Sequence, residues 1–254
     1  MARMTFEMRE HPGWTLVNGH WLRGVSDADQ PPYALPVNGP APHTFHLPNP
    51  LPSTVPPALH WALLSIAPVR RHRNPSLWDA IATAIIRQVV RADQARIQHA
   101  RFRQAHGPRV DTPYGPVHAL PTPQTVLKLT GDDFAALGLA FKASALQAAA
   151  GAYLEYGAKW AELPPADLVA ELQTVPRIGP WTAGAAVADY THDWSLYPYT
   201  DLAVRKWAQA ATPGIEWPDD EKSFGEWWRT ITDDHLGALT VLTLAWGAHQ
   251  ASQS

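Results

Sequence analysis

Residues 172–207, LQTVPRIGPWTAGAAVADYTHDWSLYPYTDLAVRKW, decide the fold of this chain. The segment 175–179 has the composition of a tight turn between two helices, and Gly179 gives that turn backbone freedom. Pro180 suits the first position of the second helix because its missing N–H would be unpaired there in any case. The segment therefore predicts a hairpin of two helices joined by a very short turn.

The start of the second helix also predicts a binding site for an anion. Residues 182–187 are small and apolar, which favours a closely packed helix. The first backbone N–H groups of a helix have no partner within it, and the helix dipole is positive at that end. A phosphate group is an anion that such a turn suits.

A carboxylate follows the hairpin along the chain. Thr200 is a good helix N-cap, which predicts a further helix with Asp201 in its first turn. Donors at a helix start and the positive end of the dipole favour the charged form of this carboxylate. Taken alone, an aspartate at a helix start is more often structural than catalytic.

Together these features resemble a known family. VPRIGPWTA at 175–183 and YPYTDLAVRKW at 197–207 resemble the helix-hairpin-helix DNA glycosylases, specifically the 3-methyladenine DNA glycosylase II branch. That family reads LPGIGPWTA in its hairpin, and an aspartate opens a later helix at the position of Asp201. WDAIATAIIRQVVRADQA at 78–95 and GLAFKASAL at 138–146 resemble two further family segments, so the resemblance covers about two thirds of the chain.

The resemblance implies a mainly α-helical fold of two helical subdomains with a small N-terminal region that contains β-structure. We expect residues 1–68 to form a β-hairpin and a proline-rich wrap, and residues 69–254 to form the helical glycosylase domain. Asn18-Gly19 predicts the hairpin turn, whereas the many prolines of 26–57 disfavour helix there. Residues 125–137 predict a single helix.

The resemblance also implies the residues that contact DNA: Arg177, Ile178, Gly179 and Thr182 in the hairpin, and Gln88, Val89 and Arg91 at a helix end that fills the gap left by a flipped base. Gln88 matches the family's first glutamine, although bridging a helix end is an equal alternative. Arg177 replaces the first hairpin glycine. A left-handed backbone at this position would cost about 1–2 kcal/mol; alternatively the turn differs in detail, or Arg177 reaches a phosphate.

By the same resemblance, Asp201 is the catalytic carboxylate of a monofunctional DNA N-glycosylase that acts in base excision repair. An ionised carboxylate stabilises the oxocarbenium-like sugar that forms when an N-glycosidic bond breaks. Bifunctional members of the family carry a Schiff-base lysine where this chain has Trp181. Water is therefore the expected nucleophile, and an abasic site is the expected product.

Aromatic side chains around the hairpin and Asp201 are the expected walls of a pocket for the base: Trp181, Tyr190 and Tyr199. Aromatic faces attract cationic rings, so alkylated, positively charged purines are the expected substrates. For each of these side chains except Trp181, burial in the core is the favoured alternative.

Composition narrows the partners and cofactors. The chain has no cysteine, which excludes disulfides and cysteine-ligated zinc or iron–sulfur sites. Its net charge of −3 is unhelpful for DNA binding, but arginines crowd between residues 70 and 109, where they form either a DNA-binding face or a solvated one. We expect no metal and no required cofactor, although the resemblance allows a monovalent cation at the hairpin.

The apolar runs are too short for a membrane span. We expect a cytoplasmic monomer, associated with the nucleoid if the source is bacterial, whose partner is double-stranded DNA with a flipped damaged base. The alternative is a non-catalytic helix-hairpin-helix module that binds DNA and uses Asp201 only as a structural residue. Release of a base from damaged DNA would distinguish the two.

Overall fold

The computed structural model describes residues 5–37 and 43–252. These residues form two compact units, between which the chain passes several times. Unit 1 contains residues 5–10, 43–72 and 193–252, and unit 2 contains residues 11–37 and 73–192.

The predicted division after residue 68 is not the division between these units. The N-terminal segment contributes strands to both of them, because its hairpin packs in unit 2 and its flanking strands pack in unit 1. Within the predicted proline-rich wrap, Pro40 and Pro42 lie outside the described residues.

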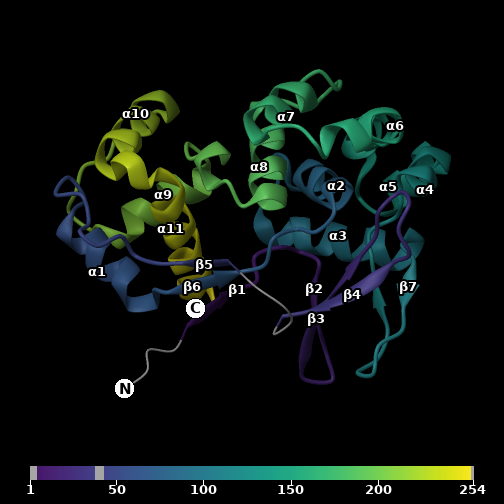
Figure 1. The fold of residues 1–254 in the computed structure, drawn as a ribbon, viewed down its shortest axis with the longest axis horizontal. Coiled ribbons are helices and arrows are strands. Elements are labelled where there is room, and N and C mark those ends of the chain that lie inside the picture. The colour runs from purple at the N-terminus through teal and green to yellow at the C-terminus, as the bar shows by residue number, and fades with distance from the viewer. Residues whose placement is uncertain (1–4, 38–42, 253–254) are drawn as a thin grey trace. The chain divides into compact units, whose positions relative to one another are not determined.

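Two antiparallel helices form the centre of unit 2: α2, Leu77–Arg87, and α8, Pro180–Thr191 (Figure 1). Almost every residue of α2 is buried, and so are most residues of α8. The alanines and Gly184 of α8 make this burial feasible, because small side chains let two helices approach closely. The predicted hairpin is confirmed, with α7, Pro165–Leu172, as its first helix.

The remaining helices of unit 2 surround this pair: α3 (Ala92–His106), α4 (Pro123–Lys128), α5 (Gly131–Ala136), the short η1 (Ala140–Lys142) and α6 (Ala143–Trp160). The prediction of one helix over 125–137 was wrong. Thr130 forms a capping box with Asp133, and this box ends one helix and begins the next.

The β-structure of unit 2 is a three-stranded antiparallel sheet, β2 (Trp14–Val17), β3 (His20–Val25) and β4 (Tyr33–Pro36), with a separate two-stranded hairpin, β7 (Arg109–Val110) and β8 (Val117–His118). The predicted turn between β2 and β3 is confirmed. Asn18 and Gly19 have φ values of 45° and 82°, as a two-residue hairpin turn with right-handed strand twist requires.

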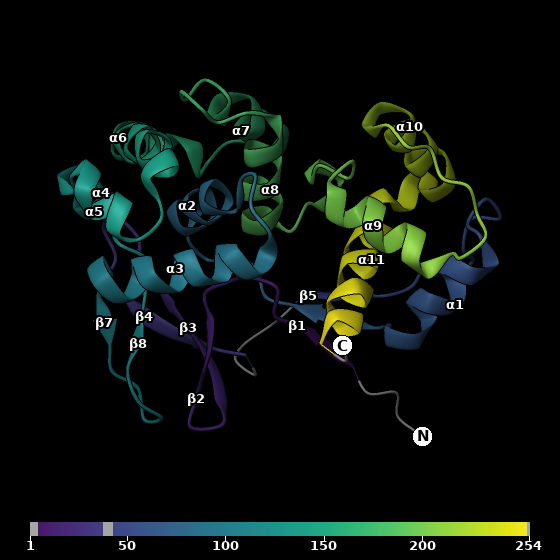
Figure 2. The same ribbon diagram turned by 180° about the vertical axis from the view of Figure 1, so that it is seen from behind.

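Unit 1 combines helices with a second three-stranded sheet (Figure 2). The sheet has the order β1 (Phe6–Met8), β6 (Val69–Arg71), β5 (His43–Phe45), and its β1–β6 pair is parallel. The helical elements are α1 (Pro57–Ile66), η2 (Trp194–Leu196), α9 (Leu202–Ala211), α10 (Glu221–Thr232), η3 (Asp233–His235) and α11 (Leu236–Ala251). In the described part of the chain, no helix is both long and apolar enough to span a membrane.

A buried polar network fixes the sheet of unit 2 to the start of α2. Arg23 of β3 donates to the carboxylate of Asp79 over 2.6 Å, and both side chains are 1% exposed. Asn74 donates to Asp79 over 2.8 Å and to Asp189 of α8 over 2.9 Å. His11 Nε2 lies 3.1 Å from Asp79 Oδ1. One carboxylate thus joins a strand, the segment before α2 and α2 itself, and Asn74 extends the connection to the end of α8.

The charges of this network follow from burial and from Arg23. Burial opposes the charge of Asp79, but the neighbouring Arg23 and His11 outweigh it and hold the pKa of this carboxyl well below its usual range. Burial lowers the pKa of His11 and lowers that of His99 further. The ring of His99 lies 5.6 Å from that of His11. Both imidazoles are therefore mostly neutral at pH 7, and Arg23 is the cation that faces Asp79.

Candidate active site and DNA-binding surface

The turn of the helical hairpin is closed by a backbone hydrogen bond of 3.1 Å from the N–H of Ile178 to the carbonyl of Val175. Arg177 adopts the left-handed conformation, with a φ of 68°, and its side chain is exposed. Glycine adopts this conformation without steric cost, whereas the arginine here bears the strain of a left-handed backbone.

Gly179 has a different role from the one predicted. It is the N-cap of α8 with extended backbone, φ −91° and ψ 179°, so the turn does not need its conformational freedom. A side chain here would meet no protein atom within 4 Å. Among the described residues, none accepts a hydrogen bond from the N–H groups of Gly179, Trp181 or Thr182. The missing side chain leaves these donors open to a phosphate.

The other predicted hairpin residues point into the protein. Ile178 is 4% exposed and Thr182 is 3% exposed. The N–H of Ile178 is already bound within the turn, and the hydroxyl of Thr182 accepts from Gln88 over 2.7 Å. Thr182 can therefore offer DNA only its backbone N–H, and Ile178 supports the turn from below.

Gln88 joins the end of α2 to the hairpin. Its amide nitrogen donates to the carbonyl of Arg177 over 3.2 Å and to the hydroxyl of Thr182 over 2.7 Å. The next residue, Val89, has a φ of 50° and is fully exposed. Gln88 therefore bridges the end of α2 and the hairpin, as the alternative interpretation predicted. At this helix end, the side chain of Val89 projects into solvent.

The arginines between 70 and 109 do not act as one basic face. In unit 1, Arg70 and Arg71 pair with glutamates of the N-terminal strand region. In unit 2, Arg103 is buried, donates to the carbonyl of His118 and to Thr15, and has its pKa lowered by burial to about 10. Arg91, the N-cap of α3, stays exposed and pairs with Asp93 over 3.0 Å. Near the hairpin, the exposed candidates for phosphate contact are Arg91 and Arg177.

Replacing Arg177 by glycine is expected to change both the stability of the protein, through backbone strain, and its DNA binding, through the lost charge. Glycine relieves the left-handed strain, and we expect the free energy of unfolding to rise by about 0.5–1 kcal/mol after the entropy of glycine in the unfolded chain is subtracted. The loss of one phosphate contact should lower the slope of log affinity against log salt by about one unit. Urea unfolding and DNA-binding titrations at several salt concentrations measure the two effects.

Arg177→Ala is the matched control, because alanine removes the charge but keeps a Cβ at the left-handed position. It should weaken DNA binding as the glycine variant does, without the gain in stability. Equal stability of the two variants would show that the turn is unstrained, and an unchanged salt slope would remove Arg177 from the DNA contacts.

In unit 1, Asp201 is held at the start of α9. It is itself the N-cap, with its carboxylate 3.4 Å from the N–H of Ala203, and the helix begins at Leu202. The prediction of Thr200 as N-cap was wrong by one residue, because the hydroxyl of Thr200 donates to Glu221 over 2.9 Å instead. The half-buried carboxylate still lies at the positive end of a helix dipole.

Tyr197 is the partner of this carboxylate that the sequence did not indicate. Its hydroxyl donates to Asp201 Oδ2 over 2.6 Å. The tyrosine ring is 3% exposed and packs against Trp194 with ring centroids 4.9 Å apart. A buried ring thus fixes one carboxylate oxygen, which makes Asp201 a preorganised charge rather than a mobile surface aspartate. A tyrosine four residues before the aspartate is the signal that was available.

The predicted walls of the base pocket are not brought together within either unit. Trp181 and Tyr190 stand nine residues apart on α8, hence about 13 Å apart along the helix axis and on opposite faces. The ring of Tyr190 lies below Arg73, at 5.6 Å from the guanidinium carbon. In unit 1, the hydroxyl of Tyr199 accepts from Arg229 over 2.6 Å. All three side chains are half-exposed, and of the three Trp181 lies in the first turn of α8, beside the hairpin turn.

No role was predicted from the sequence for two adjacent residues of unit 2, the exposed Phe141 and the buried Lys142. Phe141 is 97% exposed, which is unusual for a phenylalanine. Its neighbour Lys142 is buried, and its amine donates to the backbone carbonyl of Gln88. The 138–146 segment therefore contacts the end of α2 directly.

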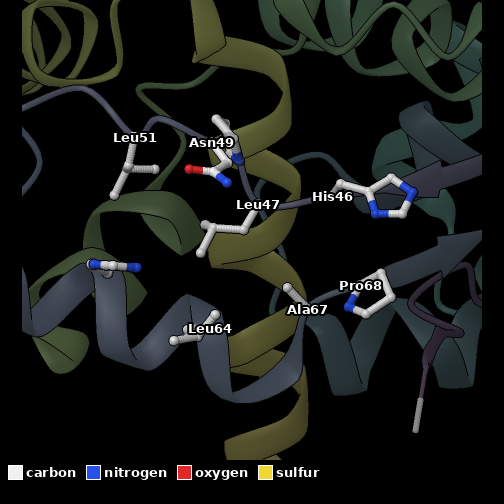
Figure 3. A pocket seen from close by; sticks show the side chains of 9 residues that line it. His46, Leu47, Asn49, Leu51, Leu64, Ala67 and Pro68 are labelled. Carbon is white, nitrogen blue, oxygen red and sulfur yellow. The ribbon is translucent and has the colours of Figure 1, made fainter. Parts of the chain in front are cut away.

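Unit 1 contains a cavity whose lining includes none of the predicted site residues. The cavity has a volume of about 330 Å³. The side chains that line it are drawn in Figure 3: His46, Leu47, Pro48, Asn49, Leu51, His60, Leu64, Ala67 and Pro68. Its lining is aliphatic with two imidazoles and one amide, and it has no carboxylate. It contains neither Asp201 nor Tyr197, so we assign it no part in the chemistry.

The described residues hold no cluster of three or more histidine, aspartate or glutamate side chains able to bind a metal ion. A monovalent cation at the hairpin would need carbonyl oxygens of the turn. Those of Val175, Arg177 and Gly179 each accept one hydrogen bond already. They fit a cation only through their second lone pairs.

The architecture of the described chain is that of the helix-hairpin-helix DNA glycosylases. Among the similar solved structures is the 3-methyladenine DNA glycosylase from Archaeoglobus fulgidus, with a TM-score of 0.63 and 20% sequence identity over 76% of this chain and 66% of that one. The Clostridium acetobutylicum 8-oxoguanine glycosylase/lyase in complex with double-stranded DNA has a TM-score of 0.61 and 17% identity over 77% and 67%. MBOgg1 bound to a DNA ligand has a TM-score of 0.62 and 15% identity over 77% and 68%.

No protein-family model and no curated protein sequence matches the chain. The similar structures carry names that refer to different damaged bases, 3-methyladenine and 8-oxoguanine. Glycosylases named for different damaged bases therefore share this fold, and the choice of substrate depends on the side chains of the site.

Proposed function

We propose that this protein is a DNA N-glycosylase that removes damaged bases by hydrolysis of the N-glycosidic bond. The observation that carries the proposal is the carboxylate of Asp201, which Tyr197 holds at the start of a helix. It follows the hairpin at the family spacing, in a chain with the glycosylase fold. A role in base excision repair follows from this activity.

In the proposed reaction, Asp201 acts on the deoxyribose rather than on the base. Its negative charge stabilises the oxocarbenium-like sugar as the base departs, and its free lone pairs orient the attacking water. The hydrogen bond from Tyr197 keeps the carboxylate in place, so that little reorganisation is needed as charge develops.

The hairpin and the end of α2 provide the proposed DNA contacts. The open N–H groups at the start of α8 and the side chains of Arg177 and Arg91 bind phosphates, while Val89 enters the gap that the extruded base leaves. The partner is double-stranded DNA, and the chain acts as a cytoplasmic monomer in this proposal.

We also propose that the enzyme is monofunctional. Trp181 occupies the position at which bifunctional relatives carry a lysine. Two other amines are placed elsewhere: Lys142 is buried against the carbonyl of Gln88, and Lys206 lies over the ring of Trp207 at 4.5 Å. Water is therefore the nucleophile of the proposal.

Alkylated purines are the proposed substrates. Alkylation at N3 or N7 gives the base a positive charge, so that it leaves as a neutral molecule and needs little protonation. Trp181, half-exposed beside the hairpin, offers a face for such a cation. The contacts of Tyr190 and Tyr199 with arginines argue against their part in this pocket.

The test is incubation of the protein with duplexes that carry 3-methyladenine, 7-methylguanine, 8-oxoguanine or uracil. We expect alkali-labile sites to form fastest at the two alkylated purines, and no covalent DNA complex to be trapped with borohydride. Fastest release of a neutral base would overturn the substrate preference, and a trapped complex would overturn the monofunctional assignment.

A non-catalytic DNA-binding module is the second candidate. The observation in its favour is the capping contact of Asp201, since an N-cap aspartate has a structural role of its own. Binding of these duplexes without release of any base would favour this candidate over the glycosylase.

A further inference from the structure

Two residues of the proposed DNA-binding surface, Val89 and Arg177, have left-handed backbone although neither is glycine. Their φ values are 50° and 68°. This conformation is unfavourable for any L-residue and most of all for a β-branched one such as valine. Such strain persists only where surrounding contacts hold it, so each residue should have a partner that fixes its peptide group.

Both partners are present, and they form a chain of contacts. The side chain of Gln88 donates to the carbonyl of Arg177. The carbonyl of Gln88, which begins the peptide group that leads into Val89, accepts in turn from the amine of Lys142. Lys142 therefore holds the peptide that sets φ of Val89, and Gln88 extends the same contact to the hairpin.

Lys142 makes this contact although burial is unfavourable for a charged amine. Its side chain is 8% exposed, and burial lowers the pKa of its amine. The carbonyl that it binds lies at the end of α2, where helix carbonyls lack partners and a cation is favoured by the dipole. Without the amine, the Gln88 carbonyl could rotate, and Val89 could relax to an ordinary backbone conformation and turn its side chain away.

We propose that Lys142 is a positioning residue for base extrusion: it fixes the Gln88–Val89 peptide so that the valine side chain projects from the protein surface. The inference rests on the proposed function, because it assigns the valine to the gap left by an extruded base. Lys142 touches neither the base nor the sugar in this assignment. Its effect should therefore appear only where extrusion from a paired stack is costly.

The experiment compares two duplexes that differ in this cost. Both contain 7-methylguanine, paired with cytosine in one and opposite an abasic-site analogue in the other, where extrusion costs less. Lys142→Met keeps the aliphatic stem and removes the donor. We expect it to lower the single-turnover rate of base release about tenfold on the paired duplex and by less than about twofold on the unpaired one.

The controls separate positioning from folding. Lys142→Arg restores a cationic donor and should recover most of the rate, whereas Lys128→Met, at an exposed lysine of unit 2, should change neither rate. Val89→Ala should reproduce the selective loss, and adding Lys142→Met to it should cause no further fall if both act through one side chain. An equal loss on both duplexes, or independent losses from the two substitutions, would overturn the proposal.

A binding measurement keeps this inference distinct from the glycosylase activity. 2-Aminopurine placed beside an abasic-site analogue brightens when a protein unstacks it. If the wild-type protein releases no base but raises this fluorescence, and Lys142→Met does not, the positioning role stands while the proposed activity fails. If the wild-type protein neither releases the base nor raises the fluorescence, both are overturned.

Discussion

Asp201→Asn is expected to lower the rate of base release by about 100-fold or more, as the loss of one preorganised charged group does at other catalytic sites. Asparagine has nearly the size of aspartate and is an equally good N-cap, so α9 should still begin at Leu202. The substitution removes the negative charge that stabilises the sugar cation. Single-turnover kinetics on the 7-methylguanine duplex measures the loss, and DNA affinity should stay unchanged.

Asp220→Asn is the matched control for this substitution. Asp220 is the N-cap of α10 in the same unit, where its carboxylate accepts from the N–H of Ser223 over 2.9 Å. No tyrosine among the described residues donates to its carboxylate, and the proposal gives it no part in the reaction. An equal loss of activity from Asp220→Asn would point to helix capping, and full activity of Asp201→Asn would remove the carboxylate from the mechanism.

Tyr197 explains why the carboxylate could be predicted from the sequence while its setting could not. A helix start near Asp201 follows from a local pattern, and the resemblance to the glycosylase hairpin singles out its carboxylate. The contact of the Tyr197 hydroxyl depends on a ring that Trp194 packs against. Twelve tryptophans and seven tyrosines offered many such pairs, and no local rule selects one of them.

Local patterns elsewhere in the chain predicted structure well for the same reason. The Asn18-Gly19 turn and the start of α8 at Pro180 depend on the backbone preferences of single residues. The left-handed Arg177 could be anticipated only by comparison with the glycine of related hairpins. The division of the chain into its two units could not, because it depends on which strands pair across long separations.

The antiparallel helices α2 and α8 connect the buried polar network of unit 2 to the proposed DNA-binding surface. At one end, Asn74 before α2 bonds to Asp189 near the end of α8. At the other end, Gln88 after α2 bonds to Thr182 in the first turn of α8. The antiparallel helices are thus joined by side-chain hydrogen bonds at both ends. The hairpin turn and Val89 lie at the second end, where the hydrogen bonds of Gln88 to Arg177 and Thr182 join α2 to the hairpin.

Asp79→Ala is therefore expected to destabilise unit 2 strongly, by about 3–5 kcal/mol, because it leaves Arg23 buried without its counter-charge. Urea unfolding of the full chain, followed by tryptophan fluorescence, measures the loss.

Asp93→Ala is the matched control: its carboxylate pairs with Arg91 in an exposed ion pair, and its removal should be nearly neutral. Replacing Asp79 by leucine together with Arg23→Met should recover much of the stability, since two apolar side chains leave no buried charge unpaired. A loss below about 1 kcal/mol from Asp79→Ala, within the range of exposed pairs, would show that the network does not hold the sheet to α2.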